Sequence, residues 1–398
     1  MLDSIYIGMS GLTAYSQGLQ TISNNVANMN SPGFKATTPR FADLFYGQQF
    51  APGQAGAPAT MSFGSGVEYG YASIDFSQGN IQQSDGDLDL AIQGNGFLAL
   101  LDGNKVQYAR TGQFVAGDDG YIVDKVTSLR LAALDPNGKL VPISLSGNTI
   151  SPPAATTTIQ FSNNLSSGAT DFSIPNVTVY DGSGNKHSLT INFKPDSGIF
   201  PGRWAVTVTD ENGKVVQKSP LQFLGGIPEP GMDTIDVTMS PDGGGPFTFT
   251  LDFSSGVTSF SAGSVSTLSV SSSDGYGAGT LSSLYIDENG ALNVGYSNGQ
   301  TLELGSIALA SFTDPQLLTQ QGNGLFDASR SSAPQYSISR GPGVGTLVSG
   351  AVEASNVDLS TEFGRLILVQ RGFQASSQVI STANEMIMQL FQMRGPQG

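Results

Sequence analysis

Few side chains in this sequence are of the kinds that carry out enzyme chemistry. The 398 residues include a single histidine, His187, and no cysteine. A lone histidine beside a predicted hairpin turn is far more often a surface residue than a general base or a metal ligand. Without cysteine there is also no thiolate nucleophile and no thiolate metal site. We therefore expect no His-dependent catalytic triad, no bound metal and no catalytic residue.

Two further stretches resemble ligand sites only in part. Asp85, Asp87 and Asp89 alternate as at the start of a calcium loop, but the sixth position lacks Gly and the twelfth lacks Glu. The stretch GPGVGTL at 341–347 lacks the Lys-Ser/Thr ending of a phosphate-binding loop, and no helical pattern follows it. We expect no cofactor. A paired-carboxylate enzyme stays open as an alternative, because 32 acidic residues are present and their arrangement in space is not visible in the sequence.

Composition limits the class of protein. Only 12% of the residues are charged, and 51 are glycine, which favours β-structure with many turns. The formal net charge of −15 argues against nucleic acid or an anionic membrane as a partner. No apolar run approaches the roughly 18 residues of a membrane span, so we expect no membrane insertion. The N-terminus also lacks the pattern of a cleaved signal peptide, which predicts either a cytoplasmic protein or export by another route.

Both ends of the chain carry helical patterns in which apolar residues recur every three or four positions. The predicted N-terminal helix contains Gly8, Gly11 and Gly18, each of which costs a helix interior about 1 kcal/mol relative to Ala. At the C-terminus a second stripe of smaller residues accompanies the main one, and Gly395 and Pro396 end the pattern. The predicted apolar seams are Leu2, Ile5, Met9, Leu12, Leu19 and Val26 in the first helix, and Phe363, Leu366, Phe373, Ile380, Ile387 and Phe391 in the second.

The two helices can be interpreted in two ways. They form a helical hairpin packed on a globular core, or they form a coiled pair whose remaining surface is completed by other copies of the chain. Scarce charge on the remaining faces favours assembly, because solvent-exposed helix faces normally carry Lys and Glu. Asn24, Asn25 and Asn28 lie off the seam, and their uncharged amides suit lateral contacts between identical subunits. They also mark the last turn of a helix that ends before Ser31-Pro32-Gly33.

Between the helices the sequence is typical of short strands joined by Gly and Asn-Gly turns. If the helices pair, the chain leaves and returns to one place, so we expect nested domains. The predicted fold is mixed and mainly β, with discontinuous nested β-domains and terminal helices that pair as a coiled coil. The expected segments are an N-terminal helix (1–30), an extended linker (31–70), an inner β-domain (71–145 plus 285–350), an inserted outer β-domain (146–284) and a C-terminal helix (351–398).

Several stretches resemble one family of bacterial proteins. SGLTAYSQGLQTISNNVANMNSPGFKA at 10–36 is similar to the N-terminal signature of the flagellar rod, hook and hook-associated axial proteins. DLDLAIQGNGFLAL (87–100), YARTGQF (108–114) and DDGYIVD (118–124) resemble internal motifs of the rod and hook members. SGAVEASNVDLSTEFGRLILVQRGFQASSQVISTANEMI at 349–387 resembles their C-terminal signature. The inserted outer β-domain and the stretch FTDPQLLTQQGNGLFDAS (312–329) are similar to the hook members, whereas the opening MLDSIYIGMSGL is closer to some rod or hook-associated members.

The resemblance implies a structural subunit with no enzymatic activity. It implies self-assembly into a helical tubular polymer, the curved flexible hook that transmits torque from rod to filament. The implied partners are the rod, hook-cap and hook–filament junction proteins and the flagellar type III export apparatus, with export to the flagellum without a cleaved signal peptide. The seam residues of the terminal helices would line a central channel. The alternatives are a distal rod subunit of the same family and, from another class, a secreted carbohydrate-active enzyme.

Overall fold

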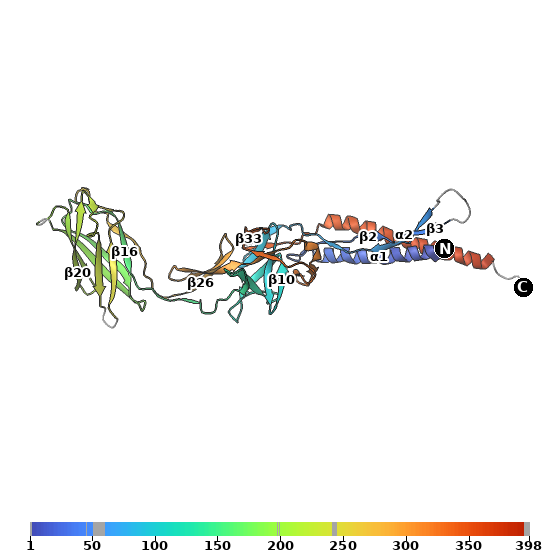
Figure 1. The fold of residues 1–398 in the computed structure, drawn as a ribbon, viewed down its shortest axis with the longest axis horizontal. Coiled ribbons are helices and arrows are strands. Elements are labelled where there is room, and N and C mark those ends of the chain that lie inside the picture. The colour runs from blue at the N-terminus through green and yellow to red at the C-terminus, as the bar shows by residue number, and fades with distance from the viewer. Residues whose placement is uncertain are drawn as a thin grey trace. The chain divides into compact units, whose positions relative to one another are not determined.

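Figure 1 shows the protein in a computed structural model, which describes residues 2–44, 46–50, 60–196, 198, 200–240 and 245–393. The chain divides into two compact units. Unit 1 contains Met1–Ser146, Leu284–Asn293 and Glu303–Gly398, and unit 2 contains Gly147–Ser283 and Val294–Leu302. Strands dominate, and the N- and C-terminal helices pack together, so the predicted fold class is confirmed.

The terminal helices of unit 1 are α1 (Leu2–Ala27) and α2 (Leu359–Met393). They run antiparallel, because Gly8 near the start of α1 faces Ile380 and Gly18 further along it faces Val369. At about 1.5 Å per residue the 26 residues of α1 span roughly 40 Å and the 35 residues of α2 roughly 50 Å. The C-terminal end of α2 therefore extends past the start of α1 (Figure 1). No helix in the described part of the chain is long and apolar enough to cross a membrane.

Side-chain hydrogen bonds define the ends of these helices. At the C-terminal end of α1, the Asn28 amide nitrogen Nδ2 donates to the carbonyl of Asn24 at 2.9 Å, and the backbone N–H of Asn28 donates to the same carbonyl at 3.1 Å. Gly33 then takes a φ of 70°, which a residue with a side chain rarely adopts. At the start of α2, Asp358 Oδ1 accepts the N–H of Thr361 at 2.8 Å, as an N-terminal cap does.

The stretch expected to be an extended linker (31–70) forms short antiparallel strand pairs, one of them with residues 73–74 just beyond it. One of its strands contacts α1, where Thr21 Oγ1 lies 2.6 Å from Tyr69 Oη. The ring of Phe41 lies 5.2 Å from that of Tyr15. The strands are β1 (Thr37–Thr38), β2 (Phe41–Asp43), β3 (Tyr46–Phe50), β4 (Thr60–Gly64), β5 (Val67–Tyr69) and β6 (Ser73–Ile74).

The β-body of unit 1 is a branched antiparallel sheet in which β13 pairs with β28, β12, β14 and β9, and β8 pairs with β11 and β33. Its core includes Leu98, Leu100, Ile122 and Leu131, all fully buried. The elements are β7 (Ile81–Gln83), β8 (Asp89–Gln93), β9 (Phe97–Asp102), β10 (Lys105–Ala109), β11 (Thr111–Ala116), β12 (Ile122–Asp124), β13 (Arg130–Leu134), β14 (Leu140–Pro142), β29 (Leu309–Ser311), η1 (Pro315–Leu317), β30 (Thr319–Gln320), β31 (Leu325–Asp327), β32 (Gln335–Ser337), β33 (Thr346–Ser349) and β34 (Ala351–Glu353).

Unit 2 is a β-sandwich of two five-stranded sheets. One sheet has the order β17-β18-β19-β20-β21, and the other contains β22-β23-β16-β24 with β25 paired to β16. The inner faces meet in one apolar core, in which the rings of Phe193 and Phe253 lie 6.0 Å apart. The strands are β16 (Thr158–Asn164), β17 (Phe172–Tyr180), β18 (Lys186–Pro195), β19 (Arg203–Thr209), β20 (Val215–Leu224), β21 (Ile227–Pro228), β22 (Thr234–Met239), β23 (Phe247–Asp252), β24 (Val257–Thr258) and β25 (Ser269–Ser273).

The remaining strands lie near or across the division between the two units: β15 (Ile150–Ser151), β26 (Gly279–Ile286), β27 (Ala291–Tyr296) and β28 (Thr301–Ile307). Residues 294–302 belong to unit 2, whereas the segments expected from the sequence include them in the inner β-domain. Repeated Asp-based turns join many of the hairpins. In one of them, Asp210 Oδ1 accepts the N–H groups of Asn212 and Lys214, and Gly213 takes a φ of 77°.

Candidate assembly surface

The two terminal helices approach each other along small residues. Gly8 and Gly11 are buried on α1 and face α2. A Cβ at Gly8 would lie 2.6 Å from Ile380 Cγ1, and one at Gly11 would lie 2.5 Å from Ser376 Oγ. These distances are shorter than real Cβ contacts, so a side chain at either position would have to displace Ile380 or Ser376. The glycines therefore bring the helices together, and the packing of the two helices offsets their low helix propensity.

The predicted seam of α1 is not the line of closest contact. Ala14 and Ile22, which lie on the same side as the glycines, are 1% and 0% exposed. Met9 is 53% exposed. Of the other predicted seam residues, Leu2 begins α1, and Ile5, Leu12, Leu19 and Val26 are only partly buried. The contact therefore lies one stripe away from the predicted seam, because small residues permit the closer approach.

The same displacement occurs on α2. Val369 and Ala383, from the stripe of smaller residues, are buried against α1. Ile380 is the member of the main predicted seam that packs against a glycine of α1. Leu366 and Ile387 are half-buried, whereas Phe363, Phe373 and Phe391 are exposed.

Large apolar side chains consequently remain in solvent around the helix pair. On α2 they lie on several sides of the helix, with Leu368 72% and Phe391 71% exposed. α1 has a single charged residue, Asp3, in its 26 residues. A large patch of exposed apolar side chains normally marks a contact with another molecule, so we expect this surface to be covered. The exposed apolar surface comprises Tyr6, Ile7, Met9, Leu359, Phe363, Ile367, Leu368, Phe373, Val379, Met386, Met388, Leu390 and Phe391.

The three asparagines expected at lateral contacts have different environments. Asn25 is fully buried, and its side chain accepts the N–H of Thr37 at 3.0 Å and donates to the carbonyl of Thr37 at 2.8 Å. Its amide therefore fixes the chain that follows α1, and it is not free to reach a neighbouring subunit. Asn24 is exposed and Asn28 half-buried, and both line a depression whose other walls include amide side chains such as Gln321. That Asn24 and Asn28 contact neighbouring subunits stays a prediction.

A buried ionic cluster joins the segments that enter and leave the helix pair. Glu353, at the end of β34, is fully buried, as is Lys35, and Arg110 is 3% exposed. Glu353 Oε1 accepts from Lys35 Nζ at 2.6 Å and from the N–H of Gly79 at 2.9 Å, and Glu353 Oε2 accepts from Arg110 Nε at 3.1 Å. Burial lowers the pKa of Lys35, the hydrogen bond and charge of Glu353 oppose that shift, and the charge of Arg110 adds to it. Two cations thus share one carboxylate away from water.

Asn356 strengthens the same junction. Its Oδ1 accepts the N–H of Ala36 at 2.8 Å, and its Nδ2 donates to the carbonyls of Asp75 and Ser77 at 2.8 and 3.0 Å. Hydrogen bonds and ion pairs therefore connect three segments just before α2 begins: residues 33–36, 75–79 and 353–356. No pattern in the sequence indicates this junction, because its members are up to 320 positions apart.

The residues considered for chemistry have structural roles. His187 Nε2 lies 3.3 Å from Asp181 Oδ2 in a hairpin of unit 2. Hydrogen bonds to this carboxylate, chiefly from Asn185 and also from His187, lower the pKa of Asp181 to about 2. Asp89 accepts from Gln113 Nε2 at 3.0 Å and from Ser84. Within the part of the chain that the structure describes, no group of three His, Asp or Glu residues is placed to hold a metal ion.

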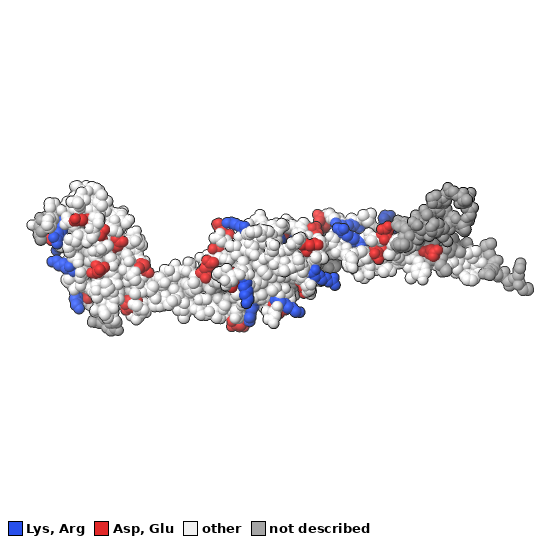
Figure 2. Space-filling model, viewed as in Figure 1, with Lys and Arg blue, Asp and Glu red and all other residues white. Residues whose placement is uncertain are grey.

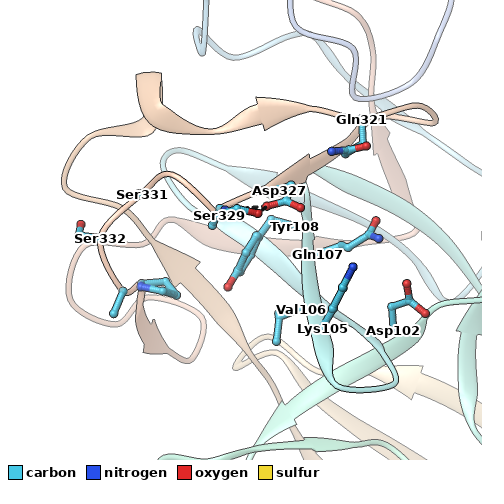
Figure 3. Close-up of a pocket in the computed structure, with 13 residues that line it drawn as sticks. Asp102, Lys105, Val106, Gln107, Tyr108, Gln321, Asp327, Ser329, Ser331 and Ser332 are labelled. Atoms are coloured by element: carbon cyan, nitrogen blue, oxygen red, sulfur yellow. Dashed lines mark hydrogen bonds between the residues drawn. The ribbon is translucent and has the colours of Figure 1, made fainter.

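A depression of about 520 Å³ lies beside the β9–β10 hairpin (Figure 3). Two carboxyl groups, Asp102 and Asp327, line it. Asp327 accepts two hydrogen bonds from Ser329, which lower its pKa. The Tyr108 hydroxyl lies 3.0 Å from that of Tyr336, and burial raises the pKa of Tyr108. A glycosidase needs a carboxyl group with a raised pKa as its general acid. The lowered pKa of Asp327 is the opposite of what a general acid needs.

Comparisons with known proteins agree with the terminal motifs. A family model described as flagella basal body rod protein matches residues 5–35, and one described as flagellar basal body rod FlgEFG protein C-terminal matches residues 348–393. The crystal structure of Helicobacter pylori flagellar hook protein FlgE2 aligns with 69% of this chain and 99% of that chain, with a TM-score of 0.48 and 13% identity. The flagellar hook protein FlgE of Escherichia coli K12 is 31% identical over 415 residues, which cover 97% of this chain and 98% of the relative. That of Salmonella typhimurium is 31% identical over 418 residues with the same coverage. The resemblance predicted from the terminal motifs is thus confirmed, and this chain belongs to the flagellar hook protein family.

Proposed function

We propose that this protein is the structural subunit of a flagellar hook, and that copies of it polymerise into a curved, flexible tube that transmits torque from rod to filament. The hook proteins to which it is similar over nearly its whole length support this function. The subunit acts through contacts between copies, and its ionisable residues have structural roles. A distal rod subunit is the alternative from the same family.

The observation that carries the proposal is the apolar surface left around α1 and α2. A single chain buries the glycine side of α1 but leaves large side chains such as Leu368 and Phe391 in water. Burying apolar surface releases about 25 cal/mol per Å², so several such side chains per copy give a strong drive to assemble. Because the surface surrounds the pair, one partner does not cover it, and a polymer with several neighbours per subunit does.

The finer assignments follow from the family. The terminal helices would form the inner wall of the tube, with the predicted seam residues other than Ile380 facing its channel or neighbouring subunits. The expected segments (1–30, 31–70, 71–145 plus 285–350, 146–284 and 351–398) would act as inner helices, linker, inner β-domain and outer β-domain. The ends of the polymer would contact rod, hook-cap and hook–filament junction proteins. Export would proceed through the flagellar type III apparatus, and the location would be the flagellar hook.

Charge substitution on the exposed apolar surface tests the proposal. Leu368→Glu and Phe391→Glu place a carboxylate where the side chain is largely in water, so the isolated chain should keep its fold. In a polymer the same carboxylate would be buried without a partner, which is strongly unfavourable. We expect the purified wild-type chain to form tubes visible by negative-stain electron microscopy and both variants to stay monomeric in sedimentation velocity.

Gln374→Glu is the matched control, because it adds the same charge at an exposed polar position of α2. It should polymerise more readily than the two apolar-to-acid variants. Tubes formed by Leu368→Glu and Phe391→Glu at the wild-type concentration would contradict the role of this surface. Antibody labelling of cells distinguishes the two family alternatives, because a hook subunit lies on a short curved segment outside the cell and a rod subunit on a straight shaft within the envelope.

A further inference from the structure

The strands of the two sheets of unit 2 carry charged side chains of opposite sign on their outward faces, and acidic residues such as Asp196 and Asp210 lie in the turns of the first sheet. The basic face is the outer side of the β17-β18-β19-β20-β21 sheet, and the acidic face is the outer side of the β22-β23-β16 sheet. All five Lys and Arg residues of unit 2 fall between positions 186 and 218, in or beside the strands of the first sheet. The second sheet is made from segments that contain no Lys or Arg.

Strand register places the basic side chains on one side of the first sheet. Lys186 pairs with Tyr180, while the neighbouring pair joins His187 to the buried Val179, so Lys186 points away from the core. Alternation with buried residues likewise turns the other basic side chains outward. The four basic residues of this face are Lys186, Lys194, Arg203 and Lys218. The five strands of this sheet, all within the described residues, contain no Asp or Glu.

The opposite face carries aspartates among hydroxyl side chains. Asp236 lies between the buried residues Ile235 and Val237 on β22, and it accepts from the Thr250 hydroxyl at 2.8 Å. Asp252 pairs with Thr234 and also points outward. In Figure 2 the Lys and Arg side chains of this unit gather along the edge where Figure 1 labels β20, and most of the visible Asp and Glu lie elsewhere on it.

We propose that the basic face of unit 2 in one copy docks on the acidic face of unit 2 in the next copy. Two different faces of the same unit then form one head-to-tail contact, and repetition of such a contact generates a helical array. The partner is a second copy because both complementary surfaces belong to this chain, which at a net charge of −15 repels its copies elsewhere. The proposal rests on the proposed function in that it names the contact between neighbouring outer units.

This contact is weak and depends on salt. The three lysines of the basic face are exposed, whereas Arg203 is half-buried and already has Asp196 at 3.7 Å within its own unit. Polar side chains such as Thr248 and Gln160 fill the rest of the acidic face. A contact of this kind forms and separates readily, which lets neighbouring units shift as a tube bends.

Cysteine cross-linking tests the proposal directly, because the natural chain has no cysteine. Thr207→Cys places a thiol on the basic face beside Lys218, and Thr248→Cys places one on the acidic face. The two full-length variants are mixed and treated with a short bismaleimide. We expect cross-linked dimers between the two variants at several times the yield of either variant alone, and a several-fold fall in yield between about 0.05 and 1 M NaCl as charges are screened. Same-face dimers at equal yield, or a yield independent of salt, would overturn the proposal.

Charge reversal provides a second, independent readout on the same cross-link. Lys194→Glu with Lys218→Glu should lower the opposite-face yield several-fold, as should Asp236→Lys with Asp252→Lys. Combining all four in one chain restores complementary faces with exchanged signs, so the yield should recover. Failure of the four-fold variant to recover while it keeps the wild-type circular dichroism would count against the proposal.

The matched control for net charge is Lys125→Glu with Lys139→Glu, which changes two exposed lysines of unit 1 and should leave the cross-link unchanged. Sedimentation of the same samples separates this proposal from the proposed function. Polymers without opposite-face cross-links would refute the docking of faces and leave the hook function standing. Opposite-face cross-links without polymers would support the docking and count against polymerisation.

Discussion

Replacing Glu353 by glutamine tests whether the buried ionic cluster holds the β-body of unit 1 to the chain segments that lead into the helices. The carboxylate is fully buried and accepts three hydrogen bonds, from Lys35, Gly79 and Arg110. Glutamine keeps the shape but removes the negative charge, so two buried cations lose their counter-ion. Removing one partner of a buried ion pair costs about 3–5 kcal/mol. With a urea m-value of about 2–3 kcal/mol/M, the unfolding midpoint of unit 1 should fall by roughly 1–2 M.

The assay needs a signal for each unit, because a two-unit chain does not unfold in a single two-state step. Trp204 is the single tryptophan of the sequence and is buried in the core of unit 2. Its fluorescence therefore follows unit 2 alone, while circular dichroism at the helix band follows the helices of unit 1. Glu353→Gln should shift the circular dichroism transition to lower urea and leave the Trp204 transition in place.

Two controls sharpen the measurement. Lys35→Met leaves Glu353 paired with Arg110, so it removes the excess positive charge and should cost less than Glu353→Gln. Asp119→Asn breaks an exposed pair in which Arg130 Nη2 lies 2.8 Å from Asp119 Oδ2, and it should change the midpoint little. The reasoning is refuted if Glu353→Gln unfolds at the wild-type urea concentration, or if Lys35→Met is the more damaging of the two.

Two further predictions concern the helix pair and the hairpin of Asp181. Gly11→Leu should separate the helices, because even a Cβ there would lie 2.5 Å from Ser376 Oγ, and the hydrogen exchange of α1 amides should accelerate. In Gly364→Ala the added Cβ meets no atom within 4 Å, so this substitution should stabilise α2 by about 1 kcal/mol. The pKa of Asp181 is about 2 in the folded chain, below its ordinary value of 3.8, so its contribution to stability is present above pH 4 and is lost as the pH falls from about 4 to 2. Asp181→Asn should flatten the acid-unfolding curve, followed by Trp204 fluorescence, in that window, and an unchanged curve would contradict the prediction.

The spacing of apolar residues predicted both helices, but it did not identify the side on which they meet. In α1 the pattern of large side chains marks Met9, which is exposed, while the contact runs along Gly8 and Gly11. Hydrophobicity favours burying large residues, yet close approach of two helices favours small ones. In a protein that assembles, the large residues can be covered by other copies, so a single chain shows them exposed.

Contacts between distant segments were beyond sequence reasoning. Asn25 looked free for a lateral contact because it lies off the seam, and its partner Thr37 is set by the path of the chain after α1. Lys35 and Glu353 are 318 positions apart, and neither stands in a pattern that indicates the other. Turns are the opposite case, because the Asp-x-Asn-Gly sequence carries its own hydrogen bonds and glycine conformation. The hairpin at Asp210 could therefore be predicted locally.

The two proposed surfaces differ in a way that suits a flexible tube. Apolar contact around α1 and α2 depends little on direction and is not screened by salt, so it can hold subunits together while their angle changes slightly. The charged faces of unit 2 form few, exposed and screened contacts, which can be lost on the outside of a bend and regained on the inside. If both surfaces were apolar, one packing would be locked and the curvature fixed. If both were charged, the polymer would dissolve as ionic strength rose. A strong apolar attachment at the chain ends with weak polar contacts between sandwiches therefore predicts that added salt changes the stiffness of the tube before it changes its length.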